Sequence, residues 1–82
     1  MNVEQRAAVE KAVWSDPGRM SGAPCFRNTR VPVQSLIDFL ETGETVDDFL
    51  ALYPSITREQ VTAVLDFANQ QLIECVSSLT SA

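Results

Sequence analysis

Histidine is absent from the 82 residues of this chain. Its absence removes the side chain most often used as a general base and as a metal ligand. The two cysteines, Cys25 and Cys75, are too far apart for the closely spaced pairs of zinc and thiol-redox sites. We therefore expect no metal and no cofactor, and we interpret both thiols as reduced, small apolar groups.

Catalytic motifs are also missing. Lysine occurs once, at Lys11, and the sequence holds neither a glycine-rich phosphate loop nor a nucleophile elbow. Adjacent acids such as Asp47 and Asp48 lack an accompanying base. No apolar run approaches the length of a membrane span, and residues 1–6 lack the apolar segment of a signal peptide. We expect a non-enzymatic protein that stays in the cytoplasm.

Charge is unevenly distributed along a chain that is long enough for only one domain, residues 1–82. Residues 1–32 carry five basic and three acidic side chains, whereas residues 33–82 carry one basic and eight acidic side chains. The net charge of −5 argues against broad nucleic-acid binding, so any contact with an anion should come from the first part of the chain.

The first third of the chain predicts a helix followed by a hairpin. Apolar residues spaced for one helix face cover residues 3–14, and a Ser-Asp-Pro-Gly turn follows. Residues 19–33 predict two short extended pieces around a turn at Asn28 and Thr29, with Asn28 at positive φ. Pro24 and Pro32 lack an N–H, which places these pieces at a sheet edge.

Residues 33–79 predict three helices. The first covers residues 33–42, and the second covers 46–53 with Thr45 as its N-cap and Asp48 at the third position. Thr57 and Gln60 fit a capping box that opens a long helix over residues 57–79. The last two helices and their short turn have helix-turn-helix proportions. The expected fold is mainly α, with an N-terminal helix and a short β-hairpin.

The basic residues near the turn form the candidate nucleic-acid surface. Phosphates would meet arginine side chains and the backbone amides of the turn, and the long helix would add one cation at its start. The alternative is that Arg27 and Arg30 pair with acidic helices, and the sequence leaves both readings open. The predicted DNA-binding residues are Arg19, Arg27, Asn28, Thr29, Arg30 and Arg58.

The apolar stripe of the last helix outruns any core that a chain of this length can build. Such a stripe is best buried by another subunit, and the hairpin edges could pair in the same way. We therefore predict a homodimer with the interface residues Cys25, Phe26, Val31, Leu72, Cys75, Val76 and Leu79.

The segment GAPCFRNTRVPV at residues 22–33 carries a family resemblance. Together with Gly43-x-Thr45, Tyr53-Pro54 and Thr57-x-x-x-Val61, it resembles the small prokaryotic proteins called domain of unknown function 433. The likeness covers about residues 16–72, and Asn28 stands where the family has glycine. The resemblance implies a homeodomain-like helix-turn-helix domain, dimeric, acting as the antitoxin partner of a PIN-like ribonuclease toxin.

The sequence and the resemblance together predict the antitoxin of a type II toxin–antitoxin pair. Such a protein would neutralise its toxin, bind operator DNA as a dimer and regulate transcription. The alternative is a dimeric interaction module, or a stand-alone regulator, with no toxin partner and no DNA binding.

Overall fold

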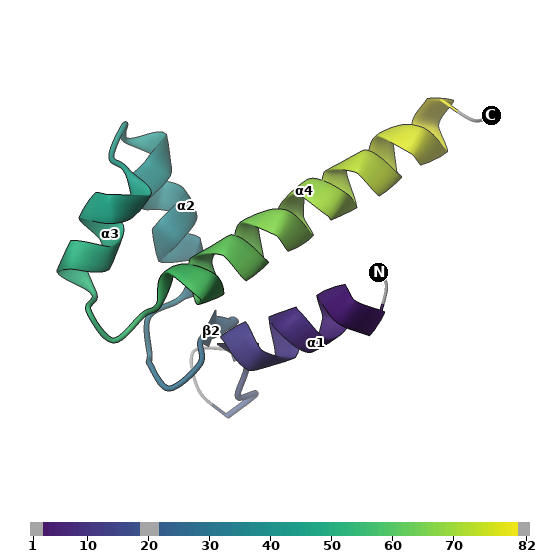
Figure 1. Ribbon diagram of the computed structural model, residues 1–82. Helices are drawn as coiled ribbons and strands as arrows, with labels where there is room; N and C mark the ends of the chain where they lie inside the picture. Colours follow the sequence, from purple (N-terminus) through teal and green to yellow (C-terminus); the bar gives the residue numbers. More distant parts are fainter. Residues whose placement is uncertain (1–2, 19–21, 81–82) are drawn as a thin grey trace.

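The computed structural model describes residues 3–18 and 22–80 and is mainly helical (Figure 1). Four helices and one pair of short strands make up the fold, which confirms the predicted class. The elements are α1 (Val3–Ala12), β1 (Val13–Trp14), β2 (Cys25–Phe26), α2 (Val33–Glu41), α3 (Val46–Leu52) and α4 (Arg58–Thr80). No helix among the described residues combines the length and the apolarity needed to cross a membrane.

The strand pairing differs from the predicted hairpin. β1 pairs with β2 in antiparallel register, with Val13 opposite Phe26 and Trp14 opposite Cys25. The first helix therefore ends at Ala12, two residues earlier than expected, and its last two predicted residues form a strand. Of the predicted hairpin region, residues 19–21 lie outside the described part of the chain.

The second extended piece joins this sheet through one isolated bridge between Cys25 and Pro32. The backbone N–H of Phe26 donates to the Val31 carbonyl at 3.0 Å, and that of Val33 donates to the Pro24 carbonyl at 2.9 Å. Because Pro32 has no N–H, the pairing cannot extend as a regular ladder. β2 is thus flanked on both sides.

The turn between β2 and this bridge has the predicted conformation. Asn28 has a φ of 66°, in the left-handed region that asparagine tolerates better than most side chains. The N–H of Thr29 donates to the Phe26 carbonyl at 3.0 Å, and the Trp14 indole N–H donates to the Thr29 carbonyl at 2.9 Å. Trp14 therefore anchors the turn to β1.

Local signals set the helix ends as predicted. Thr45 and Asp48 form a reciprocal capping box at the start of α3. Thr57 and Gln60 do the same for α4, where the Thr57 N–H donates to Gln60 Oε1 at 2.8 Å and the Gln60 N–H donates to Thr57 Oγ1 at 3.2 Å. α2 ends before Gly43, whose φ of 91° suits glycine.

The core lies where β2, α2, α3 and the first turns of α4 meet. Phe49 is completely buried, and its ring centroid lies 5.9 Å from that of Phe26, 5.7 Å from that of Phe39 and 5.0 Å from that of Tyr53. The buried cluster consists of Phe26, Leu36, Phe49, Ile56, Val61 and Val64.

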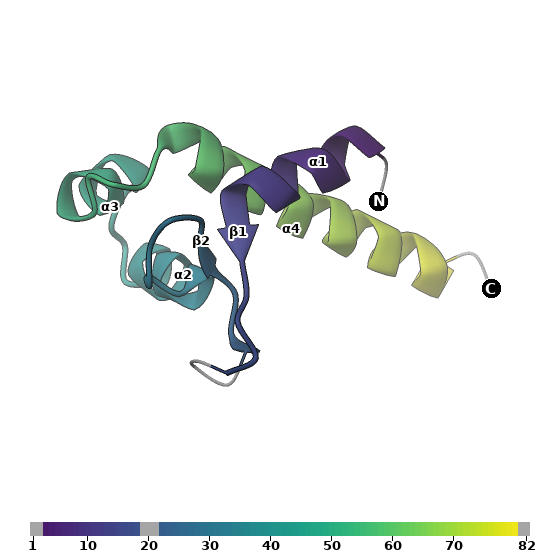
Figure 2. The same ribbon diagram turned by 90° about the horizontal axis from the view of Figure 1, so that it is seen from below.

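Two sides of α4 are occupied near its N-terminus. α1 packs against α4, and α2 and α3 lie across the helix from α1 (Figures 1 and 2). In both views the C-terminal end of α4 extends past every other element. This arrangement leaves its last turns outside the core.

Candidate functional site

A cavity of about 680 Å³ lies between α1 and the first turns of α4. Its lining includes alanines of both helices, among them Ala8 and Ala63, together with Lys11, Arg27 and Asn28. The remaining lining residues are Glu4, Ala7, Ala12, Ser55, Thr57, Glu59 and Gln60. The cavity is thus lined by apolar side chains and by charged residues of both signs.

Gln60 connects three of the segments that line the cavity. Its side-chain N–H groups donate to the Ala12 carbonyl at 3.2 Å and to the Arg27 carbonyl at 3.3 Å, while its amide oxygen accepts from Thr57. One side chain therefore fixes the start of α4, the end of α1 and the turn after β2 relative to one another.

Arg27 is a structural residue in this arrangement. Its guanidinium donates to the carbonyl oxygen of Glu10 and, at 2.9 Å, to that of Val13. The Glu10 carbonyl lies in the last turn of α1 and the Val13 carbonyl lies in β1 directly after it. A cation here is stabilised by the unpaired acceptors and the dipole at the C-terminal end of the helix. Among the described residues, the Arg27 guanidinium therefore contacts main-chain carbonyls, where one reading had expected acidic side chains.

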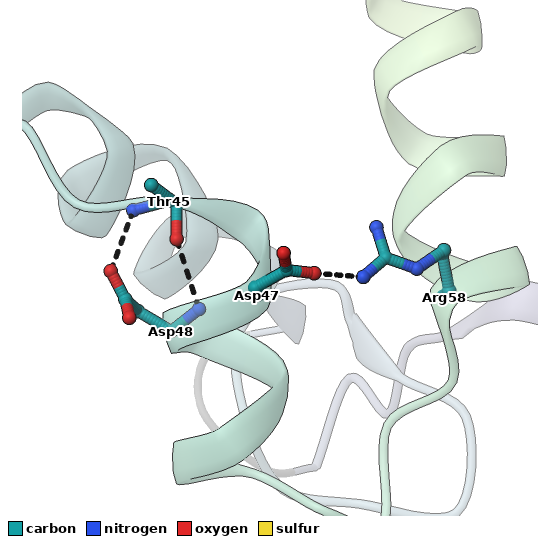
Figure 3. A network of polar contacts seen from close by, with 4 residues as sticks. All are labelled: Thr45, Asp47, Asp48 and Arg58. Carbon is teal, nitrogen blue, oxygen red and sulfur yellow. Dashed lines mark hydrogen bonds and ion pairs between the residues drawn. The ribbon is translucent and has the colours of Figure 1, made fainter.

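Arg58 forms an ion pair with Asp47 across the turn between α3 and α4 (Figure 3). The two side chains are 61% and 78% exposed, so the pair adds at most about 1 kcal/mol to the stability of the fold. The positive charge predicted to meet phosphate is matched by this neighbouring carboxylate.

The other predicted DNA-binding residues fall into different environments. The Thr29 hydroxyl donates to the Phe26 carbonyl at 2.8 Å and accepts from the Val31 N–H at 3.1 Å, so it serves the turn. Asn28 and Arg30 are exposed, and the Arg30 guanidinium has no polar partner among the described residues. Arg19 lies outside the described residues.

An acidic surface covers the end of α2 and the start of α3. Glu41, Glu44, Asp47 and Asp48 are all exposed there, and Leu52, one helical turn after Asp48 on α3, is 58% exposed. The described acids do not gather into a set of three that could hold a metal ion. We call these five residues the acidic face; it offers four exposed carboxylates and one exposed apolar side chain.

Asp48 belongs to the acidic face and also caps α3 (Figure 3). Its carboxylate accepts from the Thr45 N–H at 3.2 Å, and the Thr45 hydroxyl accepts from the Asp48 N–H at 3.1 Å. The hydrogen bonds with Thr45 lower the pKa of the Asp48 carboxyl from its ordinary value. Asp48 is therefore held ionised at the helix N-terminus.

The predicted interface residues divide into two groups. Cys25 and Phe26 are buried within the protomer, with exposures of 4% and 0%, and Val31 packs half-buried against the core. The side chains of Cys25 and Phe26 are therefore not available to a second copy. The four residues predicted on α4 are all exposed: Leu72, Cys75, Val76 and Leu79.

Sequence reasoning missed three contributors. Lys11 joins Arg27 and Asn28 at the cavity, although it stands far from them in sequence. Gln60 was recognised as a cap, but its contacts with Ala12 and Arg27 span 48 and 33 positions, and no local signal carries them. Leu52 lies off the apolar stripe of its helix, Val46, Phe49, Leu50 and Tyr53, and that periodicity could have signalled its exposure.

Comparison with known proteins identifies one family. The sequence model of the family described as "Protein of unknown function (DUF433)" matches residues 13–68. The chain is also 32% identical over 59 residues to the uncharacterized protein y4eO of Sinorhizobium fredii (strain NBRC 101917 / NGR234). That match covers 72% of this chain and 27% of the relative's length. No solved structure matches the chain.

Proposed function

Because the chain belongs to the DUF433 family, we propose that it is a non-catalytic antitoxin of a type II toxin–antitoxin pair. In this proposal the protein neutralises a PIN-like ribonuclease, binds operator DNA as a dimer and acts in the cytoplasm. The partner class comes from the family resemblance of residues 22–61. The acidic face is the observation that carries the proposal for this chain.

The acidic face suits a ribonuclease as partner. An enzyme that binds RNA needs a basic surface, and a basic surface is attracted to clustered carboxylates before contact is made. Leu52, which is 58% exposed one helical turn after Asp48, supplies an apolar side chain for a partner to bury. A partner bound here would have its RNA-binding surface covered.

In this proposal operator DNA binds to the exposed basic residues near the turn after β2. Lys11, Arg27, Asn28 and Arg30 are exposed at or beside the turn after β2, and a dimer would present this set twice. Contacts of this kind neutralise phosphates and so weaken as salt concentration rises. Sequence readout would need additional contacts with base edges.

A second candidate is an interaction module that binds a protein partner but no DNA. The observation that favours it is that two of the predicted arginines already have partners within the fold: carbonyls of α1 and β1 for Arg27, and Asp47 for Arg58. Both candidates use the acidic face. They differ only in the role of the basic residues.

Affinity capture from the native host, with nuclease treatment and mass spectrometry, tests the protein partner. Wild type should retain a small ribonuclease in stoichiometric amount, and Leu52→Lys should lose it. Ile73→Lys is the matched control, because Ile73 is 49% exposed and lies on α4, away from the acidic face. Recovery of the chain alone from every sample would contradict the antitoxin proposal.

A further inference from the structure

We propose that the C-terminal half of α4 binds the same segment of a second copy in an antiparallel two-stranded coiled coil. This inference deepens the dimeric part of the proposed function, and it stands whether or not the protein binds a toxin or DNA. In that interface Ala68 faces Leu79 of the second copy, and Leu72 faces Cys75 of the second copy.

The first ground is that α4 is much longer than the elements that cover it. Its 23 residues span about 34 Å, whereas the ten residues of α1 span about 15 Å. Residues 71–79 are all exposed, including Leu72 at 61% and Leu79 at 75%. An apolar stripe of this length needs a partner to leave water.

The second ground is continuity with the core. Ala68, Leu72, Cys75 and Leu79 follow one another at spacings of four, three and four residues, the repeat of a coiled-coil seam. At 3.6 residues per turn this seam continues the side of α4 on which Val61 and Val64 enter the core. The core buries this side of α4 in its first turns, and a second helix packed on the seam would bury the same side in its last turns.

The third ground is charge. Glu74 is the one charged residue between Phe67 and Leu79, and it lies on the side of α4 away from the seam. The residues flanking the seam, Asn69, Gln71, Val76 and Ser78, are uncharged. Two copies of a chain with a net charge of −5 can thus meet here without local repulsion, whereas a strongly charged partner finds no complement.

The sizes of the seam side chains determine whether the two α4 helices run parallel or antiparallel. Two parallel copies in register would place Ala68 against Ala68 and Leu72 against Leu72, so a layer of two small residues would leave a void. Antiparallel copies pair one large residue with one smaller residue in each of the four layers. This even filling favours the antiparallel arrangement, and it sets the two domains at opposite ends of the paired helices.

Pairwise crosslinking of the full chain tests both the surface and the direction. Ala68→Cys and Leu79→Cys are each introduced into a Cys75→Ala background, in which Cys25 stays buried. Antiparallel pairing predicts that the two variants crosslink when mixed and oxidised, and that neither crosslinks alone. Identical positions are 11 residues out of register in that arrangement, about 16 Å along the axis and beyond the reach of a disulfide.

Sedimentation velocity at about 10 to 500 μM checks association without thiols, since a four-layer seam predicts a weak dimer. Leu72→Lys should raise the dimer dissociation constant at least tenfold and so shift the protein to monomer. Ile73→Lys, on the other side of α4, should leave the dissociation constant unchanged. Crosslinking of each cysteine variant with itself would overturn the antiparallel direction. A monomer throughout this range, with no crosslink in the mixture, would overturn the interface.

Discussion

The side-chain amide of Gln60 donates to the main-chain carbonyl oxygen of Ala12 at a distance of 3.2 Å. This bond joins the first turn of α4 to the last residue of α1, which are 48 positions apart. The same amide group donates to the Arg27 carbonyl, and its oxygen accepts from Thr57. Gln60 therefore connects the turn that carries the basic residues to both α1 and α4.

Gln60→Ala should lower the free energy of unfolding by about 2 kcal/mol, because it removes a helix cap and two further hydrogen bonds together. In a domain of this size the melting temperature should fall by about 10 °C. Thermal unfolding followed by circular dichroism measures this. Gln70→Ala, in the same helix but away from these acceptors, should change little; an equal loss of stability in both variants would contradict the role given to Gln60.

Asn28→Ala should destabilise the fold by about 1 kcal/mol, because alanine at positive φ is strained. Asn28→Gly should stay within about 0.5 kcal/mol of wild type, since glycine adopts this conformation freely but orders at greater entropic cost. Urea unfolding midpoints of both variants give the comparison, with Asn69→Ala on α4 as the control. If Asn28→Ala is as stable as Asn28→Gly, the turn geometry is not as described.

Asp48 should contribute a pH-dependent part of the stability. Its pKa is lower in the folded state than the ordinary value of 3.8, so its contribution is present above that pH and is lost as pH falls through the lowered value. Asp48→Asn should therefore lose less stability than wild type on acidification from about pH 6 to below the lowered pKa.

Thr45→Ala should reduce the same pH dependence in part, because the Thr45 side chain makes the largest contribution to the lowered Asp48 pKa, while the Thr45 backbone N–H still donates to the carboxylate. Denaturant unfolding at both pH values, for the two single variants and the double variant, isolates the pair. Identical acid sensitivity in wild type and Asp48→Asn would contradict this assignment.

Alanine substitutions at Arg27 and Arg30 should have different effects, one on stability and the other on DNA binding. Arg27→Ala removes a cation from the carbonyls of Glu10 and Val13 at the end of α1 and the start of β1, and should cost about 1 kcal/mol of stability. Arg30→Ala should leave stability unchanged and weaken binding to the protein's upstream DNA. Removal of one phosphate-neutralising side chain should reduce the slope of log K against log salt by about 0.9.

Fluorescence anisotropy at two salt concentrations, together with melting curves, measures both effects. Lys11→Ala should behave like Arg30→Ala, because both side chains are exposed cations near the turn. Absence of salt-dependent binding by wild type would favour the module that binds no DNA.

Helix ends could be predicted from sequence because their signals are local. Thr45 with Asp48 and Thr57 with Gln60 are three positions apart, and the structure has both capping boxes. The turn at Asn28 is equally local. These features fix α2, α3 and α4 to within a residue or so of the predicted bounds.

The strand pair and the role of Arg27 could not be predicted in the same way. A strand of two residues, Val13 and Trp14, has no periodicity of its own and continues the apolar pattern of α1. Arg27 reaches carbonyls that are 14 and 17 positions earlier in the chain. Which acceptors lie beside it depends on the path of the whole chain around α4.

Titration of the partner's ribonuclease activity tests the central claim most directly. The captured ribonuclease is assayed on a fluorogenic RNA while the full chain is added, with Leu52→Lys and Ile73→Lys as paired variants. The account predicts complete inhibition at one chain per ribonuclease by wild type and by Ile73→Lys, and at least tenfold weaker inhibition by Leu52→Lys. Undiminished RNA cleavage at excess wild-type chain, or equal inhibition by all three proteins, would contradict it.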